Sequence, residues 1–361
     1  MYYRNNQYMK KKPFDYRETE RERGIALIKN TNLFNNAKSG HVITYKGKEH
    51  LKEEILSDGI NNIYKPIQDD VLEYFNKNKI AFWHTPRAKE ASKKPTGHIL
   101  SSQVCCINHL FPIRHDYENV LQIAKTICTD FEKVLPINTD KYLPGYIQFE
   151  SVSDIDHLNE KKQTQSELTR GSNCTSVDAL IYAEHKNGSK YLIPIEWKYT
   201  EYYNNQDKSI ENRDGEAKEA ESKGKERLHR YSDLITDSQY LIGKKTYRNS
   251  IYFFEPFYQL MRQTLWAEQM IQHKNNERIK ADNYIHIHII PNENKKLLNK
   301  KYKVSQKPLR ESWLDNLKDK GKYIIISPWN FIKNIDNNKY GDLLNYLQVR
   351  YWNNKNNWIC G

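Results

Sequence analysis

The sequence predicts an α/β fold in which a mixed central β-sheet is flanked by helices. Through the second half of the chain, stretches with helical spacing of apolar residues alternate with short apolar runs of strand length. A hairpin pattern between residues 177 and 201 places two strands side by side. The 361 residues, of which 38% are hydrophobic, are also enough to bury a sizeable core.

The first hundred residues are expected to contribute few regular elements. Residues 1–24 form a basic segment that is either poorly ordered or helical. Apolar side chains at helical spacing from Ile67 to Phe75 predict a helix over 66–79. The other expectations here are a short strand over 41–46 and a basic loop over 84–98.

Two helices and a strand should follow this region. The apolar run 104–111 predicts a helix, for which Ser101 or Ser102 is a suitable N-cap. An apolar stripe over 116–135 predicts a second helix. After it come a strand over 146–152, which carries Glu150, and a polar stretch over 153–173.

The hairpin is the most informative segment of the chain. Two apolar runs flank a turn signal at Asn187-Gly188, which predicts a tight turn between antiparallel strands over 175–184 and 190–198. Each arm is about nine residues long. The start of the first strand therefore lies opposite the end of the second.

Three charged residues converge at that end of the hairpin. Side chains alternate between the two faces of a strand, so Glu196 and Lys198 point the same way, while Trp197 points into the core on the other side. Asp178 lies opposite them at the start of the first strand. An incidental ion pair between Asp178 and Lys198 on a surface hairpin is the plainer alternative.

Two carboxylates so close together would be stabilised by a cation. Two carboxylates about 4 Å apart repel by roughly 4 kcal/mol at an effective dielectric near 20. Hard oxygen ligands suit Mg²⁺ or Mn²⁺, so Asp178 and Glu196 are candidate metal ligands. A neighbouring lysine, Lys198, can hold or deprotonate an attacking water, or stabilise charge that develops on a phosphate.

The chain beyond the hairpin returns to alternating helices and strands. Residues 202–226 are almost entirely polar, and helical spacing resumes between 228 and 241. The further elements expected are strands over 250–254, 284–290 and 323–327 and a strong helix over 256–271.

The Asp178…Glu196-x-Lys198 pattern on a hairpin resembles the PD-(D/E)XK nuclease superfamily, in a bacterial restriction-endonuclease-like branch. Val177 stands where the superfamily's proline would precede the first carboxylate. The resemblance covers roughly residues 100–290. The segments that carry it are Gly97–Gln103, Phe149-Glu150, Ile195–Glu201 and Phe254–Gln263.

This resemblance implies a restriction-endonuclease-like αβββαβ core and a metal-dependent phosphodiesterase with Asp178, Glu196 and Lys198 as catalytic residues. The rest of the chain then forms a helical N-terminal extension and C-terminal additions. The domain boundaries that follow are an extension over 1–96, a nuclease core over 97–291 and a basic loop with an α/β addition over 292–361.

Other residues have competing interpretations. Glu150 is a candidate third metal ligand or an ordinary solvent-facing residue, and Glu118 and Glu132 are alternatives for that role. Gln259 and Arg262, with Gln263, share one side of a helix and either contact a phosphate or pack structurally. His286 and His288 share a strand face, but no spaced third ligand completes a zinc site.

The charge balance favours a polyanionic partner. The formal net charge is +12, and half of it lies in residues 292–310. That segment either contacts nucleic acid or is a solvated loop. Its candidate nucleic-acid-binding residues are Lys295, Lys296, Lys300 and Lys301.

Composition also limits the cellular context. Five cysteines without a Cys-x-x-Cys pair argue against a disulfide framework or a zinc ribbon. No apolar run approaches the ~20 residues that span a bilayer, and no signal-peptide pattern opens the chain. We therefore expect a cytoplasmic protein without a membrane partner.

The leading functional hypothesis is a Mg²⁺- or Mn²⁺-dependent endonuclease that hydrolyses DNA in restriction or antiphage defence, a role that the resemblance supplies. The rivals are an RNA- or structure-specific nuclease with the same site, a catalytically silent nucleic-acid-binding subunit, and a basic scaffold whose hairpin is only structural. A homodimer is attractive because double-strand cutting commonly needs two active sites, and a partner protein of a defence system is the other option.

Overall fold

The computed structural model describes residues 15–37, 39–45, 48–83, 94–140, 142–161, 174–210 and 223–352. Much of the basic lead-in expected over 1–24 and of the basic loop expected over 84–98 lies outside these residues. The same holds for large parts of the polar stretches over 153–173 and 202–226.

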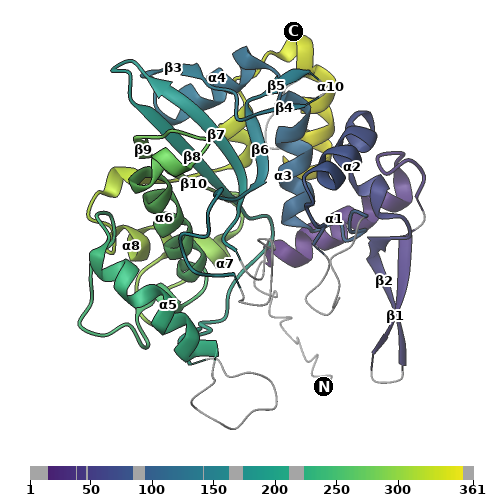
Figure 1. Ribbon diagram of the computed structural model, residues 1–361. Coiled ribbons are helices and arrows are strands. Elements are labelled where there is room, and N and C mark those ends of the chain that lie inside the picture. The colour runs from purple at the N-terminus through teal and green to yellow at the C-terminus, as the bar shows by residue number, and fades with distance from the viewer. Residues whose placement is uncertain are drawn as a thin grey trace, which may run out of the picture.

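A mixed seven-stranded sheet forms the centre of the molecule (Figure 1). Its strands are β3 (Phe131–Val134), β6 (Ile147–Ser151), β7 (Val177–His185), β8 (Lys190–Trp197), β9 (Asn283–Tyr284), β10 (His286–Ile289) and β11 (Tyr323–Ile326). Strand β7 runs antiparallel to β8, β3 and β6, whereas β8, β10 and β11 are parallel to one another. The sheet is therefore mixed, as the sequence predicts.

The expected hairpin is formed by β7 and β8. Their register pairs Ala179 with Ile195 and Glu184 with Lys190. The turn is closed by a 2.8 Å hydrogen bond from the Gly188 N–H to the His185 carbonyl. Gly188 has a φ of +83°, a left-handed conformation that glycine adopts without steric cost.

The two faces of the hairpin pack into different cores because side chains alternate along each strand. Ala179 and Ile195 belong to one buried cluster, and Leu180 and Leu192 belong to the other. Both arms of the hairpin are therefore buried on both sides. The second cluster also contains Tyr182 and, at the start of β7, Val177.

Helices cover each face of the sheet. On one side lie α3 (Ser102–Leu110), α4 (Tyr117–Ile127), α9 (Pro328–Ile332) and α10 (Asn337–Leu347). On the other side lie α5 (Lys223–Asp237), α6 (Phe257–Gln272) and α8 (Leu309–Leu314). Figure 1 shows the two groups on opposite sides of β7 and β8.

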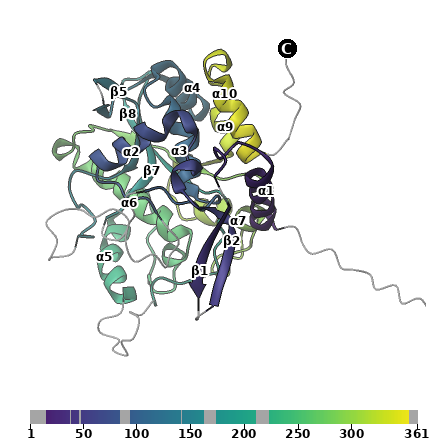
Figure 2. The same ribbon diagram turned by 90° about the vertical axis from the view of Figure 1, so that its right-hand side faces the viewer.

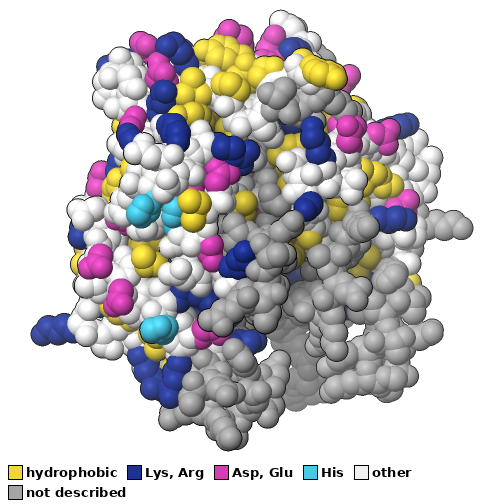
Figure 3. Space-filling model, in the orientation of Figure 1, with side chains coloured by type: hydrophobic (Ala, Val, Ile, Leu, Met, Phe, Trp, Pro, Cys, Tyr) yellow, Lys and Arg dark blue, Asp and Glu magenta, His cyan; other side chains and the backbone are white. Residues whose placement is uncertain are grey.

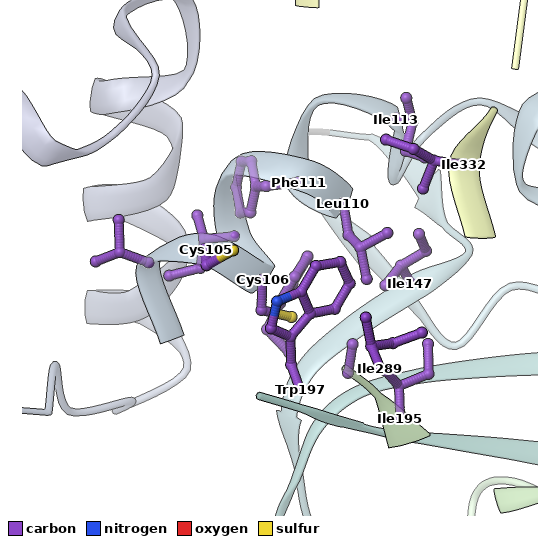
Figure 4. Packing of buried hydrophobic residues seen from close by; sticks show 14 of the residues in the cluster. Cys105, Cys106, Leu110, Phe111, Ile113, Ile147, Ile195, Trp197, Ile289 and Ile332 are labelled. Atoms are coloured by element: carbon purple, nitrogen blue, oxygen red, sulfur yellow. The ribbon is translucent and has the colours of Figure 1, made fainter. Parts of the chain in front are cut away.

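Helix α3 begins where the sequence predicts. Ser101 is its N-cap, and the Ser101 hydroxyl accepts a 3.3 Å hydrogen bond from the Val104 N–H. The helix packs directly on the sheet. Figure 4 shows the Trp197 indole pointing toward α3, where Cys106 and Leu110 lie in the same buried cluster. Trp197 is fully buried, which confirms its assignment to the core.

The N-terminal region consists of α1 (Tyr16–Asn30), the strands β1 (Ser39–Tyr45) and β2 (Lys48–Leu56), and α2 (Gln68–Lys77). Figures 1 and 2 show the two strands projecting from the body of the molecule. Helix α1 is fixed by polar contacts. The Tyr199 hydroxyl donates to Glu20 at 2.5 Å, and the Arg23 guanidinium donates to the Arg350 carbonyl.

Two expected elements differ from the structure. The helix expected over 116–135 ends at Ile127, because the chain turns at Asp130 and enters β3, where Phe131 pairs with His185. The strand expected over 250–254 is a 3₁₀ turn, Ile251–Phe253, whose apolar side chains are buried without pairing in the sheet. In both segments the apolar pattern identifies buried residues but not their backbone conformation.

The remaining described elements are short. The strands β4 (Asn138–Asp140) and β5 (Leu143–Gly145) form a separate pair, and α7 (Lys295–Leu298) lies within the segment expected to be a basic loop. Across the described ranges, none of the helices is long and apolar enough to cross a membrane.

The conformation of the turn leads to a stability prediction. Gly188→Ala should lower the free energy of unfolding by about 1 kcal/mol, because a left-handed residue with a Cβ is strained even though no atom crowds the site. Gly243→Ala is the matched control, since Gly243 has no left-handed φ and its added Cβ would make only an ordinary contact. Urea unfolding of both variants measures the difference, and equal stabilities would contradict the assigned turn conformation.

Candidate active site

A cleft of about 450 Å³ opens at one end of the hairpin. The ends of β6, β7 and β8 form its floor, and residues of α3 and α6 form its walls. The charged residues that line it are Arg17, Glu150, Asp178, Glu196, Lys198, Glu201 and Arg262. Asp178, Glu196 and Lys198 therefore share one cavity.

The hairpin register explains why Asp178 and Glu196 share this cavity. Ala179 pairs with Ile195, so the next positions outward, 178 and 196, also lie opposite each other. Both side chains line the cleft, where Glu196 accepts a hydrogen bond from Gln263 of α6 and Asp178 also borders a small cavity beside Cys106 of α3. The Asp178 carboxylate is held by a 2.7 Å hydrogen bond from the Trp197 N–H.

Lys198 lies just after β8 and returns its side chain to the same cavity. Its Nζ is 2.5 Å from Glu196 Oε1 and donates to Gln259 Oε1 at 2.9 Å. Its backbone N–H donates to the Ile289 carbonyl at 2.9 Å. Both side chains of the pair are almost fully buried, with 3% of Glu196 and 6% of Lys198 exposed.

Burial and like charge dominate the electrostatics of the cleft. The pKa of Asp178 is raised well above its ordinary value by desolvation and by repulsion from Glu196 and Glu150. Burial by itself would lower the pKa of Lys198, but attraction to Glu196 and to further neighbours, among them Tyr203 and Asp178, together raises that pKa well above its ordinary value. The lining of the cleft carries four carboxylates, against the cations Arg17, Lys198 and Arg262.

Glu150 lines the same cleft as Glu196 and Lys198, but its carboxylate is hydrogen-bonded to other residues. Its Oε1 accepts hydrogen bonds from Trp83 Nε1 at 3.0 Å and from Gln103 Nε2 at 2.8 Å. Its Oε2 accepts one from the Ser176 hydroxyl at 3.0 Å. Burial raises the pKa of Glu150 even against these three donors.

The sequence hypothesis made Glu150 a third metal ligand, with Glu118 and Glu132 as alternatives. Across the described residues, only one set of three His, Cys, Asp or Glu side chains has ligand atoms within 4.8 Å of one another, and Glu150 is not part of it. Glu150, Asp178 and Glu196 are therefore not gathered that closely. Glu118 and Glu132 are exposed and do not line the cleft.

Helix α6 supplies polar partners to the site. Gln263 donates through Nε2 to Glu196 Oε2 and, at 3.3 Å, to the Ser176 carbonyl. The Gln259 amide oxygen accepts from Lys198. Arg262 lines the cleft but its guanidinium is paired with Glu160 at 2.7 Å. Helix α6 therefore has a polar side, which contacts the Glu196–Lys198 ion pair, and a buried apolar side.

Gln259 and Arg262 line the cleft, whereas the four lysines expected to bind nucleic acid do not. Lys296 forms a 2.5 Å ion pair with Asp15, and Lys300 donates at 2.5 Å to the Tyr203 carbonyl. Lys295 and Lys301 are exposed. Figure 3 shows Lys and Arg side chains interspersed with Asp and Glu on the face in view, without one continuous basic patch.

This group of lysines is nevertheless linked to the site. Asn294, the N-cap of α7, donates through Nδ2 to the carbonyls of Tyr199 at 3.2 Å and Glu201 at 2.9 Å. Those two residues belong to the segment that leaves the cleft after Lys198. Helix α7 is therefore anchored on the chain next to the candidate active site.

Sequence reasoning missed several residues that shape the cleft. Gln103 on α3 and Ser176 before β7 hold Glu150, and Arg17 on α1 lines the opening. The Arg17 guanidinium also donates to the Thr200 hydroxyl at 3.3 Å. Gln103 could have been found, because it belongs to the segment 97–103 that carries part of the resemblance to the nuclease superfamily. Nothing in the local sequence around Arg17 points to the cleft.

A mixed α/β fold with two carboxylates and a lysine in one cleft is compatible with a restriction-endonuclease-like protein. The chain belongs to the REase-ARP family, described as a restriction endonuclease associating with ARP, whose model matches residues 20–352. Membership indicates a restriction-type nuclease and implies that it interacts with nucleic acid. No curated protein and no solved structure matches the chain.

The hydrogen bonds of Glu150 lead to a prediction that separates a structural role from metal binding. Glu150→Gln should lower the stability by about 1 kcal/mol, because a neutral amide keeps an acceptor for Trp83 and Gln103 but replaces the Oε2 acceptor of the Ser176 hydroxyl by a donor. Its Mg²⁺ affinity should change less than threefold. Thermal unfolding and calorimetric Mg²⁺ titration measure the two effects, with the exposed Glu132→Gln as the control for lost charge. A tenfold weaker Mg²⁺ affinity would assign Glu150 to the metal instead.

Proposed function

We propose that this protein is a metal-dependent endonuclease of the PD-(D/E)XK type that hydrolyses DNA phosphodiester bonds in restriction or antiphage defence. The observation that carries the proposal is the convergence of Asp178, Glu196 and Lys198 in one cleft of a chain from a restriction-endonuclease family. A helix, α4, precedes β6, β7 and β8, and α6 and β10 follow them, an order compatible with the αβββαβ core of that type.

The donor set fits a hard divalent cation. Asp178 and Glu196 line the same cavity, where burial first and then repulsion from neighbouring carboxylates raise the pKa of Asp178. Carboxylate oxygens are the ligands that Mg²⁺ and Mn²⁺ prefer, so Asp178 and Glu196 would hold the ion. When bound, the ion would polarise the phosphate oxygens as a Lewis acid.

The protein's own residues would orient the reaction. Lys198, held between Glu196 and Gln259, is placed to donate a hydrogen bond to an attacking water or to a phosphate oxygen as negative charge builds up there. Gln263 fixes the Glu196 carboxylate, and the Trp197 N–H fixes that of Asp178. Because these groups are positioned in advance, little reorganisation is needed during the reaction.

A partner-dependent nuclease is the second candidate. The family description states association with ARP, which favours a subunit that acts together with a partner protein. In this case the purified chain would bind nucleic acid and metal but cut only when the partner is added. An RNA- or structure-specific nuclease would use the same residues, and paired DNA and RNA substrates of identical sequence distinguish these substrates directly.

The division of roles within the site leads to a kinetic prediction. Lys198→Ala should retain Mg²⁺ and DNA binding but lose about 10³-fold in cleavage rate, which corresponds to about 4 kcal/mol of transition-state stabilisation. Asp178→Asn and Glu196→Gln should lose Mg²⁺ binding together with cleavage, and Mn²⁺ should partly rescue Glu196→Gln. Single-turnover cleavage of a plasmid, run beside calorimetric metal titration, measures both properties.

The control for lost charge is Lys133→Ala, because Lys133 forms a surface ion pair with Glu184 away from the cleft. It should cleave at the wild-type rate. Wild-type cleavage by Lys198→Ala, with Lys133→Ala equally active, would show that the chemistry does not take place at this hairpin.

The exposed lysines near α7 lead to a prediction about binding. Replacing Lys295 and Lys301 by Ala should make the log–log dependence of duplex affinity on salt less steep by about 2, since each phosphate contact contributes about 0.9. Any sequence preference should not change. Titrations in the Lys198→Ala background avoid cleavage during the measurement. The matched control replaces the exposed Lys320 and Lys333, and an equal effect in both pairs would indicate nonspecific loss of charge.

A further inference from the structure

A second cluster of potential ligands lies at the other end of the hairpin from the cleft. Cys128, Asp130 and His185 each offer one ligand atom, and these atoms all lie within 4.8 Å of one another. No other set of three meets this criterion in the part of the chain that the structure describes. All three side chains are partly exposed, so an ion could reach them from solvent.

The backbone brings these residues together from distant parts of the sequence. Cys128 is the C-cap of α4, and Asp130 follows in the turn that leads into β3. Strand β3 then pairs with the end of β7, where Phe131 lies opposite His185. The Lys186 N–H donates to the Asp130 carbonyl at 2.9 Å, which fixes the turn against the hairpin.

The His185 and Asp130 side chains are close to the separation that two ligands of a tetrahedral ion require. His185 Nε2 lies 3.7 Å from Asp130 Oδ2. For zinc bonds of about 2.0–2.1 Å to nitrogen and oxygen, two ligands of a tetrahedron lie about 3.3–3.4 Å apart. A movement of a few tenths of an ångström would bring His185 Nε2 and Asp130 Oδ2 to that separation.

We propose that Cys128, Asp130 and His185 bind a zinc ion, with water as the fourth ligand. A thiolate, an imidazole and a carboxylate are ligands that Zn²⁺ accepts together, whereas Mg²⁺ takes oxygen ligands alone. This donor set therefore differs in kind from the carboxylates of the cleft. The two sites would select different metals.

Two existing contacts must adjust when the ion binds. Asp130 Oδ1 is 2.9 Å from Lys186 Nζ, and this ion pair can persist while Oδ2 binds the metal. His185 Nδ1 accepts a 3.3 Å hydrogen bond from the Asn187 N–H. Binding through Nε2 moves the ring proton to Nδ1, so that long hydrogen bond is lost.

The site would connect the end of α4 and the α4–β3 turn to the β7–β8 hairpin. His185 and Asp178 are seven residues apart on β7, which corresponds to about 23 Å. The zinc ion would therefore act on the stability of the sheet edge and not on the chemistry of the cleft. The proposal stands independently of the nuclease assignment.

Cobalt spectroscopy tests the proposal because a thiolate ligand to Co²⁺ produces a near-ultraviolet charge-transfer band that oxygen and nitrogen ligands do not produce. The full-length chain, freed of metal by chelation, should show this band on titration with Co²⁺, and one equivalent of Zn²⁺ should abolish it. Cys128→Ser should lack the band. His185→Ala should bind Zn²⁺ at least ~100-fold more weakly, the upper end of losses caused by changes around zinc ligands.

Two controls separate this site from others. Asp178→Asn, which alters the cleft, and His229→Ala, which removes an exposed histidine from α5, should both keep the band. Asp130→Asn provides a further variant on the exposed turn in case Cys128→Ser does not fold, and it too should weaken Zn²⁺ binding. Absence of the band in the wild-type chain, or its persistence in folded Cys128→Ser, would overturn the proposal.

Discussion

The register between β7 and β8 is the constraint on which the rest of the structure depends. It brings Asp178 and Glu196 to one cleft, while Trp197 enters the core beneath α3. A slip by one residue would exchange the two faces of a strand, exposing the carboxylates to the apolar core and the indole to the cleft. Because both faces of the hairpin are buried, such a slip is strongly disfavoured.

This register also brings carboxylates close together, and the surrounding residues only partly offset their mutual repulsion. Four carboxylates line the same cavity, and Lys198 pairs with one of them, Glu196, at close range. Donors from α3 and α6 satisfy Glu150 and Glu196, but a hydrogen bond does not remove a net charge. The cavity therefore holds more ionisable groups than the Glu196–Lys198 ion pair alone requires.

Much of this arrangement could be predicted from the sequence because it is local. The turn at Gly188, the alternation along β8 and the helix of Gln259 and Gln263 all lie within short segments with clear periodicity. The environment of Glu150 could not be predicted in this way, since Trp83 and Gln103 reach Glu150 from other parts of the chain. The cluster of Cys128 with His185 was hidden for the same reason, because it exists only once β3 pairs with β7. The end of α4 was missed because Phe131 continues an apolar stripe although it lies in a strand.

The contacts of α1 have a consequence for the order in which the protein is completed during synthesis. Arg23 binds the carbonyl of Arg350, a residue 327 positions later, and Glu20 from the same helix binds Tyr199 next to the cleft. Contacts of such large sequence separation form late because the intervening chain must first be available. Helix α1, which carries Arg17, can therefore bind Thr200 and Tyr199 as soon as these residues have been made, whereas its contact with Arg350 must wait for about 150 further residues. A nascent chain with the β7–β8 hairpin already folded would hold this side of the cleft by the first set of contacts alone until residue 350 has left the ribosome.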